Sequence, residues 1–156
     1  MRRSFPIMVI VAGVTLALAG CSGEPKPDTK GVFVVVGDQV RELKPVVTET
    51  EFTDEGFAIQ HFSGEPAVTA KLGKFYFILY GDYRPVGLRA FAPRGPRYEE
   101  DSTKGDLTSL LASGGIAGEP EMAKCQVSKE LKSGTYALEV QQGSTILHFP
   151  FNVELY

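Results

Sequence analysis

The chain of 156 residues has few of the side chains that most often build metal and catalytic sites, with two histidines and two cysteines in all. A structural zinc site takes four ligands at close spacing, whereas His61 and His148 stand far apart in the sequence. Neither a Gly-x-Ser-x-Gly motif nor a Gly-x-x-x-x-Gly-Lys-[Ser/Thr] motif occurs, so a hydrolase nucleophile turn and a phosphate-binding loop are not indicated. We therefore expect no metal, no cofactor and no enzymatic activity.

Positive charge is also scarce. The chain has 16 Lys and Arg against 19 Asp and Glu, and its formal net charge is −3. Removal of the first 20 residues, argued below, would take away Arg2 and Arg3 and make the charge more negative. Because nucleic-acid binding normally calls for a basic surface, we expect no nucleic-acid partner.

A long hydrophobic run is missing as well. The apolar stretch over residues 5–18 is shorter than the roughly 20 residues that a membrane-spanning helix needs. It follows Arg2 and Arg3 and precedes small residues, which is the three-part plan of a secretory signal peptide. We expect a signal peptide over residues 1–20, with a permanent membrane helix as the alternative.

Leu18, Ala19, Gly20 and Cys21 end this segment, and they resemble the lipobox of bacterial lipoproteins. The resemblance implies diacylglyceryl transfer to the Cys21 sulfur, cleavage between Gly20 and Cys21, and acylation of the new amino group. One acyl chain binds a membrane only marginally, whereas two or three anchor a protein stably. The alternative is a secretory peptide that ends near an unmodified cysteine.

The residue after the lipidated cysteine bears on the location of such proteins, and here it is Ser22 instead of aspartate. By the same resemblance, Ser22 implies an outer-membrane anchor with the domain facing the periplasm, if the source has two membranes. In a bacterium with one membrane, the domain would lie on the outer face of the cytoplasmic membrane. Either way, the expected location is the cell envelope.

Lipidation of Cys21 would leave Cys125 without a disulfide partner in the same chain. Ala123, Cys125 and Val127 alternate with two polar residues, which predicts a strand that points the thiol inward. We expect a buried thiol, with an intermolecular bridge as the alternative. A catalytic thiol needs a neighbouring base, and none is close in the sequence.

Residues 21–30 are polar and contain two prolines, so we expect a flexible tether. Residues 31–156 then show short segments rich in β-branched and aromatic residues, separated by turn-forming residues. Nine strands are predicted: two in a hairpin over residues 31–43, and others over 57–62, 67–71, 75–80, 88–91, 124–127, 135–140 and 145–155. Strands at this spacing predict an all-β sandwich or barrel.

Two of these strands carry information about position. Residues 75–80 are apolar on both alternating faces, as in a central strand that is covered on both sides. Residues 145–155 alternate between apolar and polar side chains and include Pro150, which predicts an edge strand or a bulge. The alternation also resembles that of outer-membrane barrels, but the irregular strand lengths and the lipobox argue against a barrel.

One helix is predicted, over residues 104–115. Asp106 is a candidate N-cap, and Leu107, Leu110 and Leu111 follow at helical spacing before two glycines. The segments GVFVVVGDQVREL, LKSGTYALEV and FPFNVEL resemble parts of bacterial envelope lipoproteins with immunoglobulin-like domains. The resemblance implies a single immunoglobulin-like β-sandwich over residues 31–156, and it carries no catalytic motif.

Arginine and aromatic residues are interleaved over residues 83–98, a mixture that is favoured at binding surfaces. The candidate partner-binding residues are Arg84, Arg89, Phe91, Arg94, Arg97 and Tyr98. In the simpler alternative, the stretch is a solvated, proline-containing loop whose charge is neutralised by the acidic residues 99–101.

Together these features predict a membrane-anchored envelope lipoprotein that acts as a non-catalytic binding or scaffolding module for another envelope protein. The alternative is a periplasmic enzyme or small-ligand carrier whose site is assembled from residues distant in the sequence.

Overall fold

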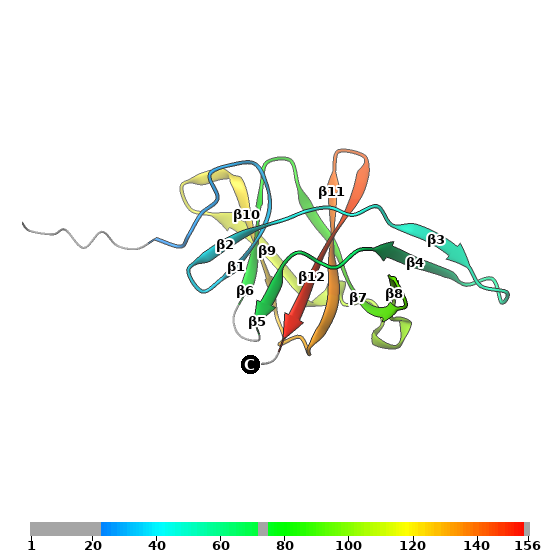
Figure 1. Cartoon of the computed structure of the whole chain (residues 1–156). Helices are drawn as coiled ribbons and strands as arrows, with labels where there is room; N and C mark the ends of the chain where they lie inside the picture. The colour runs from blue at the N-terminus through cyan, green and yellow to red at the C-terminus, as the bar shows by residue number, and fades with distance from the viewer. Residues whose placement is uncertain (1–22, 72–74, 155–156) are drawn as a thin grey trace, which may run out of the picture.

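The computed structural model of this chain describes residues 23–71 and 75–154 (Figure 1). The predicted signal peptide and Cys21 lie outside the described residues. Within these two ranges, twelve strands form two sheets, and helical structure is limited to two 3-10 turns of three residues each. The described part of the chain holds no helix with the length and apolar content that crossing a membrane would require.

The first sheet has five strands in the order β2-β1-β6-β10-β9, all antiparallel. Its strands are β1 (Gly31–Val36), β2 (Gln39–Leu43), β6 (Phe75–Tyr80), β9 (Leu111–Ile116) and β10 (Glu119–Val127). The second sheet has seven strands in the order β3-β4-β8-β7-β11-β12-β5. Its strands are β3 (Glu49–Phe52), β4 (Ala58–Ser63), β5 (Thr69–Lys71), β7 (Arg84–Arg94), β8 (Arg97–Glu100), β11 (Gly134–Gln142) and β12 (Thr145–Glu154).

The main core lies between the two sheets. Phe77 of β6 and Phe151 of β12 are fully buried and meet edge to face, with ring centres 5.2 Å apart. Tyr136 of β11 stacks on Phe151, and Leu138 fills the same layer. The predicted all-β sandwich is confirmed.

Strand β6 lies in the middle of the five-stranded sheet, between β1 and β10. Phe77 points into the main core, while Ile78 belongs to a second cluster on the outer face of the sheet, and both side chains are fully buried. The second cluster also contains Phe33, Val35 and Met122. The prediction of a central strand covered on both sides is therefore confirmed.

The described part of the predicted tether lies against β10. Lys26 forms an ion pair with Glu119 at 2.9 Å, and Lys30 forms one with Glu121 at 3.0 Å. Glu24 pairs with Lys124, whose ammonium group lies over the ring of Tyr76 on the outer face of the sheet. Pro27, between the two lysines, is buried. Residues 24–30 thus contact the sandwich through these groups, and the tether over residues 21–30 stays a prediction.

Pro150 lies at an open edge of β12. On the side of β12 away from β11, the His148 carbonyl accepts a hydrogen bond from the Val46 amide, and the Asn152 amide donates to Val68, each at 2.9 Å. Pro150 falls between these two contacts, where its missing N–H removes no ladder hydrogen bond. The prediction of an edge strand is wrong, because β5 pairs with β12 over residues 152–154 and forms the edge of the sheet. Pro150 is accommodated because β5 does not reach it.

The predicted helix over residues 104–115 is wrong. Only Thr108–Leu110 forms a 3-10 turn, and Leu111–Ile116 is strand β9. Asp106 still accepts a hydrogen bond from the Thr108 amide, at 2.9 Å, so the capping residue is used for one turn. Leu107, Leu110 and Leu111 pack against the main core. The residues from Leu111 onward pair with β10 and are therefore extended. These tertiary contacts outweigh the weak helical propensity of the segment. Strands β3, β8 and β9 are additional to the nine predicted.

Candidate functional site

The arginine-rich stretch 84–98 is a β-hairpin and not a loop. Strand β7 pairs with β11 over most of its length and with β8 near its end. Gly95 supplies the positive φ of 60° that the connection between β7 and β8 needs. The interpretation as a solvated loop is therefore wrong, because a neighbouring strand on each side recruits these residues into the sheet.

Arg89 lies on the outer face of β7 and is held by two carboxylates. Its Nε donates to Glu139 of β11 at 2.5 Å, and its Nη1 donates to Glu100 of β8 at 2.6 Å. Its side chain is one-third exposed, and that of Glu139 is almost buried. These charge-assisted hydrogen bonds link Arg89 to the two neighbouring strands. The guanidinium group is therefore already paired within the sheet.

Glu139 is the centre of this group of charges. It faces Gly87 on one neighbouring strand and His148 on the other. His148 Nε2 lies 3.7 Å from the Glu139 carboxylate, and His148 Nδ1 lies 3.3 Å from the Thr48 hydroxyl. Interaction with His148, and then the charge of Arg89, lowers the pKa of Glu139 despite its burial. The group is a satisfied network of ion pairs.

Phe91 and Tyr98 form a small apolar cluster around Phe62 of β4. Phe62 meets Phe91 edge to face, with ring centres 5.0 Å apart, and stacks on Tyr98 at 5.2 Å. Phe62 and Phe91 are buried, as is Ala137 in the same cluster. Both aromatic candidates therefore pack against the fold, and the Tyr98 hydroxyl donates to Glu65 at 2.6 Å.

The remaining candidates are spread over the hairpin. Arg97 donates to Glu51 of β3 at 2.9 Å and to Glu99 at 2.7 Å. Arg84 and Arg94 are exposed at opposite ends of β7, so the structure does not gather the six candidates into one patch. Partner binding by this stretch stays a prediction.

The two histidines lie on different strands of the seven-stranded sheet, and both are buried. His61 of β4 lies 3.9 Å from carboxylate oxygens of Glu49 and Glu51. Over residues 23–71 and 75–154, no group of three or more His, Cys, Asp or Glu side chains is placed to hold a metal ion.

Cys125 of β10 is buried in the main core, as the alternation of the sequence predicts. Burial raises the pKa of its thiol to about 11. The thiolate is the reactive form, so a nucleophilic role at neutral pH has no support in this environment.

We expect Cys125 of the folded protein to react with iodoacetamide at pH 8 more than about 100-fold more slowly than in urea, because the thiolate is scarce and enclosed. Mass spectrometry of timed samples measures the difference. The same Cys125 in the denatured chain is the internal control, and rapid labelling without unfolding would contradict burial.

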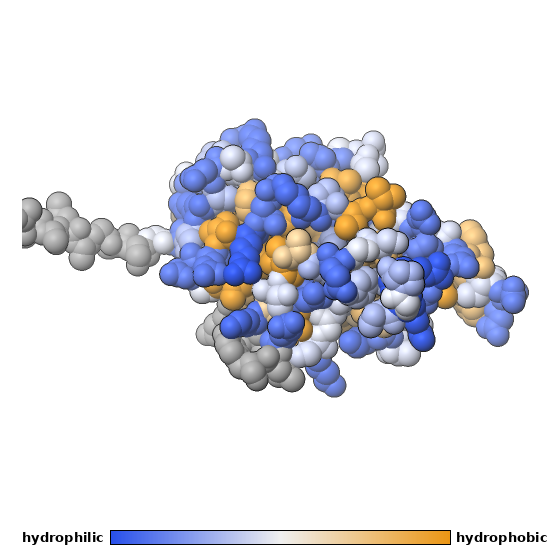
Figure 2. All heavy atoms as spheres, viewed as in Figure 1, coloured by the Kyte–Doolittle hydropathy of each residue, from blue (hydrophilic) through white to orange (hydrophobic). Residues whose placement is uncertain are grey.

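The β3–β4 hairpin is the exposed end of the seven-stranded sheet, and all four residues of β3 are exposed. It projects beyond the sandwich at the end opposite the segment that begins at Gly23 (Figure 1). Phe52 and Phe57, on the two sides of its turn, are 72% and 65% exposed. Figure 2 shows apolar atoms among hydrophilic ones at this end of the molecule.

The turn of this hairpin is well ordered by hydrogen bonds. The Thr53 amide donates to the Phe57 carbonyl at 2.8 Å, and the Phe57 amide donates to the Thr53 hydroxyl at 3.1 Å. The Gly56 amide closes the turn on the Thr53 carbonyl, and the φ of Gly56 is +83°. The exposed phenylalanines are therefore presented on a defined turn.

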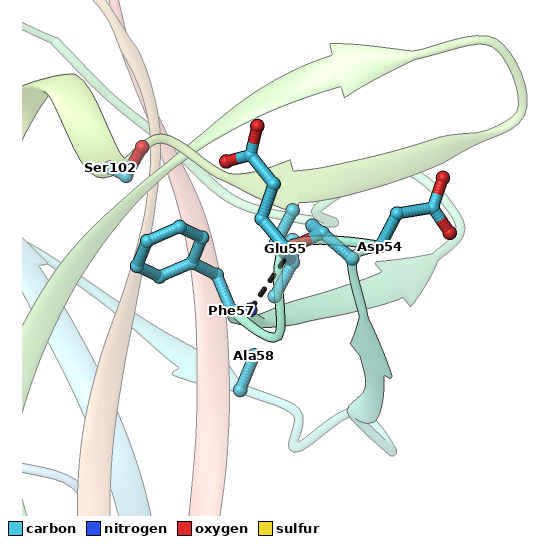
Figure 3. Close-up of a pocket in the computed structure, with 7 residues that line it drawn as sticks. Asp54, Glu55, Phe57, Ala58 and Ser102 are labelled. Carbon is cyan, nitrogen blue, oxygen red and sulfur yellow. Dashed lines mark hydrogen bonds between the residues drawn. The ribbon is translucent and has the colours of Figure 1, made fainter.

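An open groove of about 700 Å³ lies between the tip of this hairpin and the 3-10 turn that follows β8 (Figure 3). In Figure 3 the Phe57 ring extends toward Ser102 and the Glu55 carboxylate rises beside it, whereas Asp54 points away. The groove is lined by Thr53, Asp54, Glu55, Phe57, Ala58, Ile59 and Ser102.

The β3–β4 hairpin and the groove beside it were not predicted from the sequence as a site. The signal for the hairpin is the turn sequence Thr53-Asp54-Glu55-Gly56 between Phe52 and Phe57, which is a hairpin pattern. The pattern indicates a hairpin but not that its phenylalanines stay exposed, because exposure depends on which strands pack over it.

The chain matches no protein-family model, no curated protein and no solved structure. In the described part of the chain, the arginine-rich candidates lie largely within the sheet, and the β3–β4 hairpin exposes Phe52 and Phe57.

Proposed function

We propose that this protein is a lipid-anchored, non-catalytic binding module of the bacterial cell envelope. The observation that carries the binding role is the projecting β3–β4 hairpin with Phe52 and Phe57 exposed on an ordered turn. Exposed apolar surface beside polar residues is typical of interaction sites.

The anchoring half of the proposal rests on the residues Leu18 to Cys21, which have the pattern of a lipobox. Glu24 forms an ion pair with Lys124, so two residues, Ser22 and Gly23, lie between Cys21 and a residue in contact with the sandwich. The three residue steps from Cys21 to Glu24 span at most about 11 Å. The anchor would hold the domain close to the membrane surface, with the β3–β4 hairpin at the far end of the sandwich (Figure 1).

A tethered module gains affinity from confinement. Two proteins held in the same thin layer meet at a raised effective concentration, so modest contacts suffice. Outer-membrane attachment facing the periplasm is the proposed location in a bacterium with two membranes, and the outer face of the cytoplasmic membrane in one with a single membrane.

Replacement Cys21→Ser is expected to abolish incorporation of radiolabelled palmitate and to move the protein out of the membrane fraction, because the sulfur is the proposed acyl acceptor. Labelling of cells, followed by fractionation and immunoprecipitation, measures both. The matched control is Cys125→Ala, which removes the other thiol and should stay labelled. Undiminished labelling of Cys21→Ser would overturn the anchor.

The binding role is tested by in-cell crosslinking and co-purification of the full chain. We expect a specific envelope protein to be recovered in stable amount relative to the bait. Recovery of a small molecule or reaction product with the purified protein, and of no protein partner, would favour the alternative of a ligand carrier or enzyme.

A further inference from the structure

We infer that the β3–β4 hairpin docks a partner protein through a segment that carries lysine or arginine beside an apolar side chain. The inference rests on the proposed binding function and names the surface and the chemistry of the partner. The surface comprises Phe57, Ile59 and the acidic residues Asp54 and Glu55 at the hairpin tip, whereas the register of β3 and β4 places Phe52 on the opposite face of the hairpin.

Exposed apolar side chains flank the turn of the hairpin. Among the described residues, four large apolar side chains are more than half exposed, and two of them, Phe52 and Phe57, lie on the two sides of this turn. Val47 follows Val46, which bonds to β12, and Ile146 is in β12 itself. A partner that covers the hairpin would remove apolar surface from water that the fold itself leaves exposed.

The segment that contains the hairpin is acidic. Residues 45–70 contain five acidic residues and no lysine or arginine. Glu51 is paired with Arg97 and Glu65 accepts from Tyr98. For Asp54 and Glu55, both exposed, the described residues show no hydrogen bond or ion pair of the side chain. The hairpin therefore offers negative charge to a cationic partner.

The groove at the hairpin tip has both apolar and acidic walls. It combines the Phe57 ring and Ile59 with the Glu55 carboxylate (Figure 3). A lysine or arginine has an apolar stem and a cationic head, so it can lie along an aromatic ring and reach a carboxylate. The ordered turn lowers the entropy lost on binding.

The negative charge of the hairpin disfavours anionic partners and a second copy of the hairpin. Anionic lipid headgroups and nucleic acids would be repelled by the carboxylates, even though exposed phenylalanines can enter a membrane. A second copy of the hairpin would bring like charges together. A basic segment of another protein is the occupant that both the apolar and the acidic parts fit.

The test uses the full lipid-anchored chain in cells, with the photoreactive residue p-benzoylphenylalanine placed at Phe57. The control positions are Phe52, on the opposite face of the hairpin, and Ile146, which is exposed but distant in the sheet order. After irradiation, the adducts are purified and the crosslinked peptides are sequenced by mass spectrometry. We expect one protein adduct from Phe57, joined at a segment with lysine or arginine next to an apolar residue.

A charge-reversal pair sharpens the test. The double replacement Asp54→Lys/Glu55→Lys, in the p-benzoylphenylalanine background at Phe57, should lower the adduct yield at least tenfold. Reversal at the β1–β2 turn, Asp38→Lys, should leave it within twofold. Thermal unfolding of the purified variants verifies that both fold like the parent.

Four outcomes overturn the inference: an adduct segment without basic residues, a lipid adduct, an adduct with the protein's own chain, or a yield that charge reversal does not change. A protein adduct at Phe52 or Ile146 with none at Phe57 also overturns it but leaves the proposed binding function standing. Absence of any protein adduct at all three positions, with no partner in co-purification, overturns both.

Discussion

Replacement of Gly87 by alanine is expected to lower the free energy of unfolding by about 2–3 kcal/mol, near the upper end of the cost of overpacking. A Cβ atom at this position would lie 2.4 Å from a carboxylate oxygen of Glu139 and 2.9 Å from its Cδ. Glu139 has little freedom to move aside, because Arg89 and His148 hold it from two sides. Urea denaturation at neutral pH measures the loss.

Two controls isolate the cause. Gly114→Ala in β9 places its Cβ in open space and, like Gly87, has no positive φ, so we expect a change within about 0.5 kcal/mol. In the background of Glu139→Ala, the added cost of Gly87→Ala should shrink strongly, since the clashing atoms are gone. Simple additivity of the two replacements would show that the carboxylate is not the obstacle.

Replacement Glu139→Gln is expected to cost about 2 kcal/mol at pH 7, because it removes the charge that Arg89 and His148 share in a nearly buried position. The figure is below that for a fully buried pair, since Arg89 is one-third exposed and Glu100 still binds it. The isosteric change leaves no cavity, so the loss reports the charge.

The stabilisation by Glu139 depends on pH in a defined direction. Its pKa is lowered in the folded state, so the contribution is fully present above the unfolded pKa, about 4.3, and is lost as the pH falls through the lower folded value. The difference in unfolding free energy between the parent and Glu139→Gln should therefore shrink as the pH falls below the unfolded pKa of about 4.3. The exposed Glu130→Gln is the control, and a difference that grows on acidification would contradict the assignment.

Much of the architecture follows from the alternation of side chains. Residues 75–80 are apolar on both faces, and the strand they form is central and covered on both sides. Cys125 alternates with polar residues and lies in the main core. A period of two is a local property, so it is visible without knowledge of the partners.

The failures also have a physical reason. Leu107, Leu110 and Leu111 fit a helical spacing over less than two turns, which is too short to outweigh the pairing of β9 with β10. The residues of β9 include two glycines and carry little strand propensity of their own. Their extended form is imposed by the neighbouring strand.

The sequence by itself determined the class of fold and the features near the N-terminus from which an anchor is proposed, because both depend on neighbours along the chain. Only the tertiary structure decided that Arg89 meets a carboxylate 50 residues away, and that Phe91 is buried while Phe52 and Phe57 stay exposed. Those outcomes depend on which strands lie side by side and which lack a covering layer. The candidate surface thus moves from the arginine-rich strands to the acidic β3–β4 hairpin.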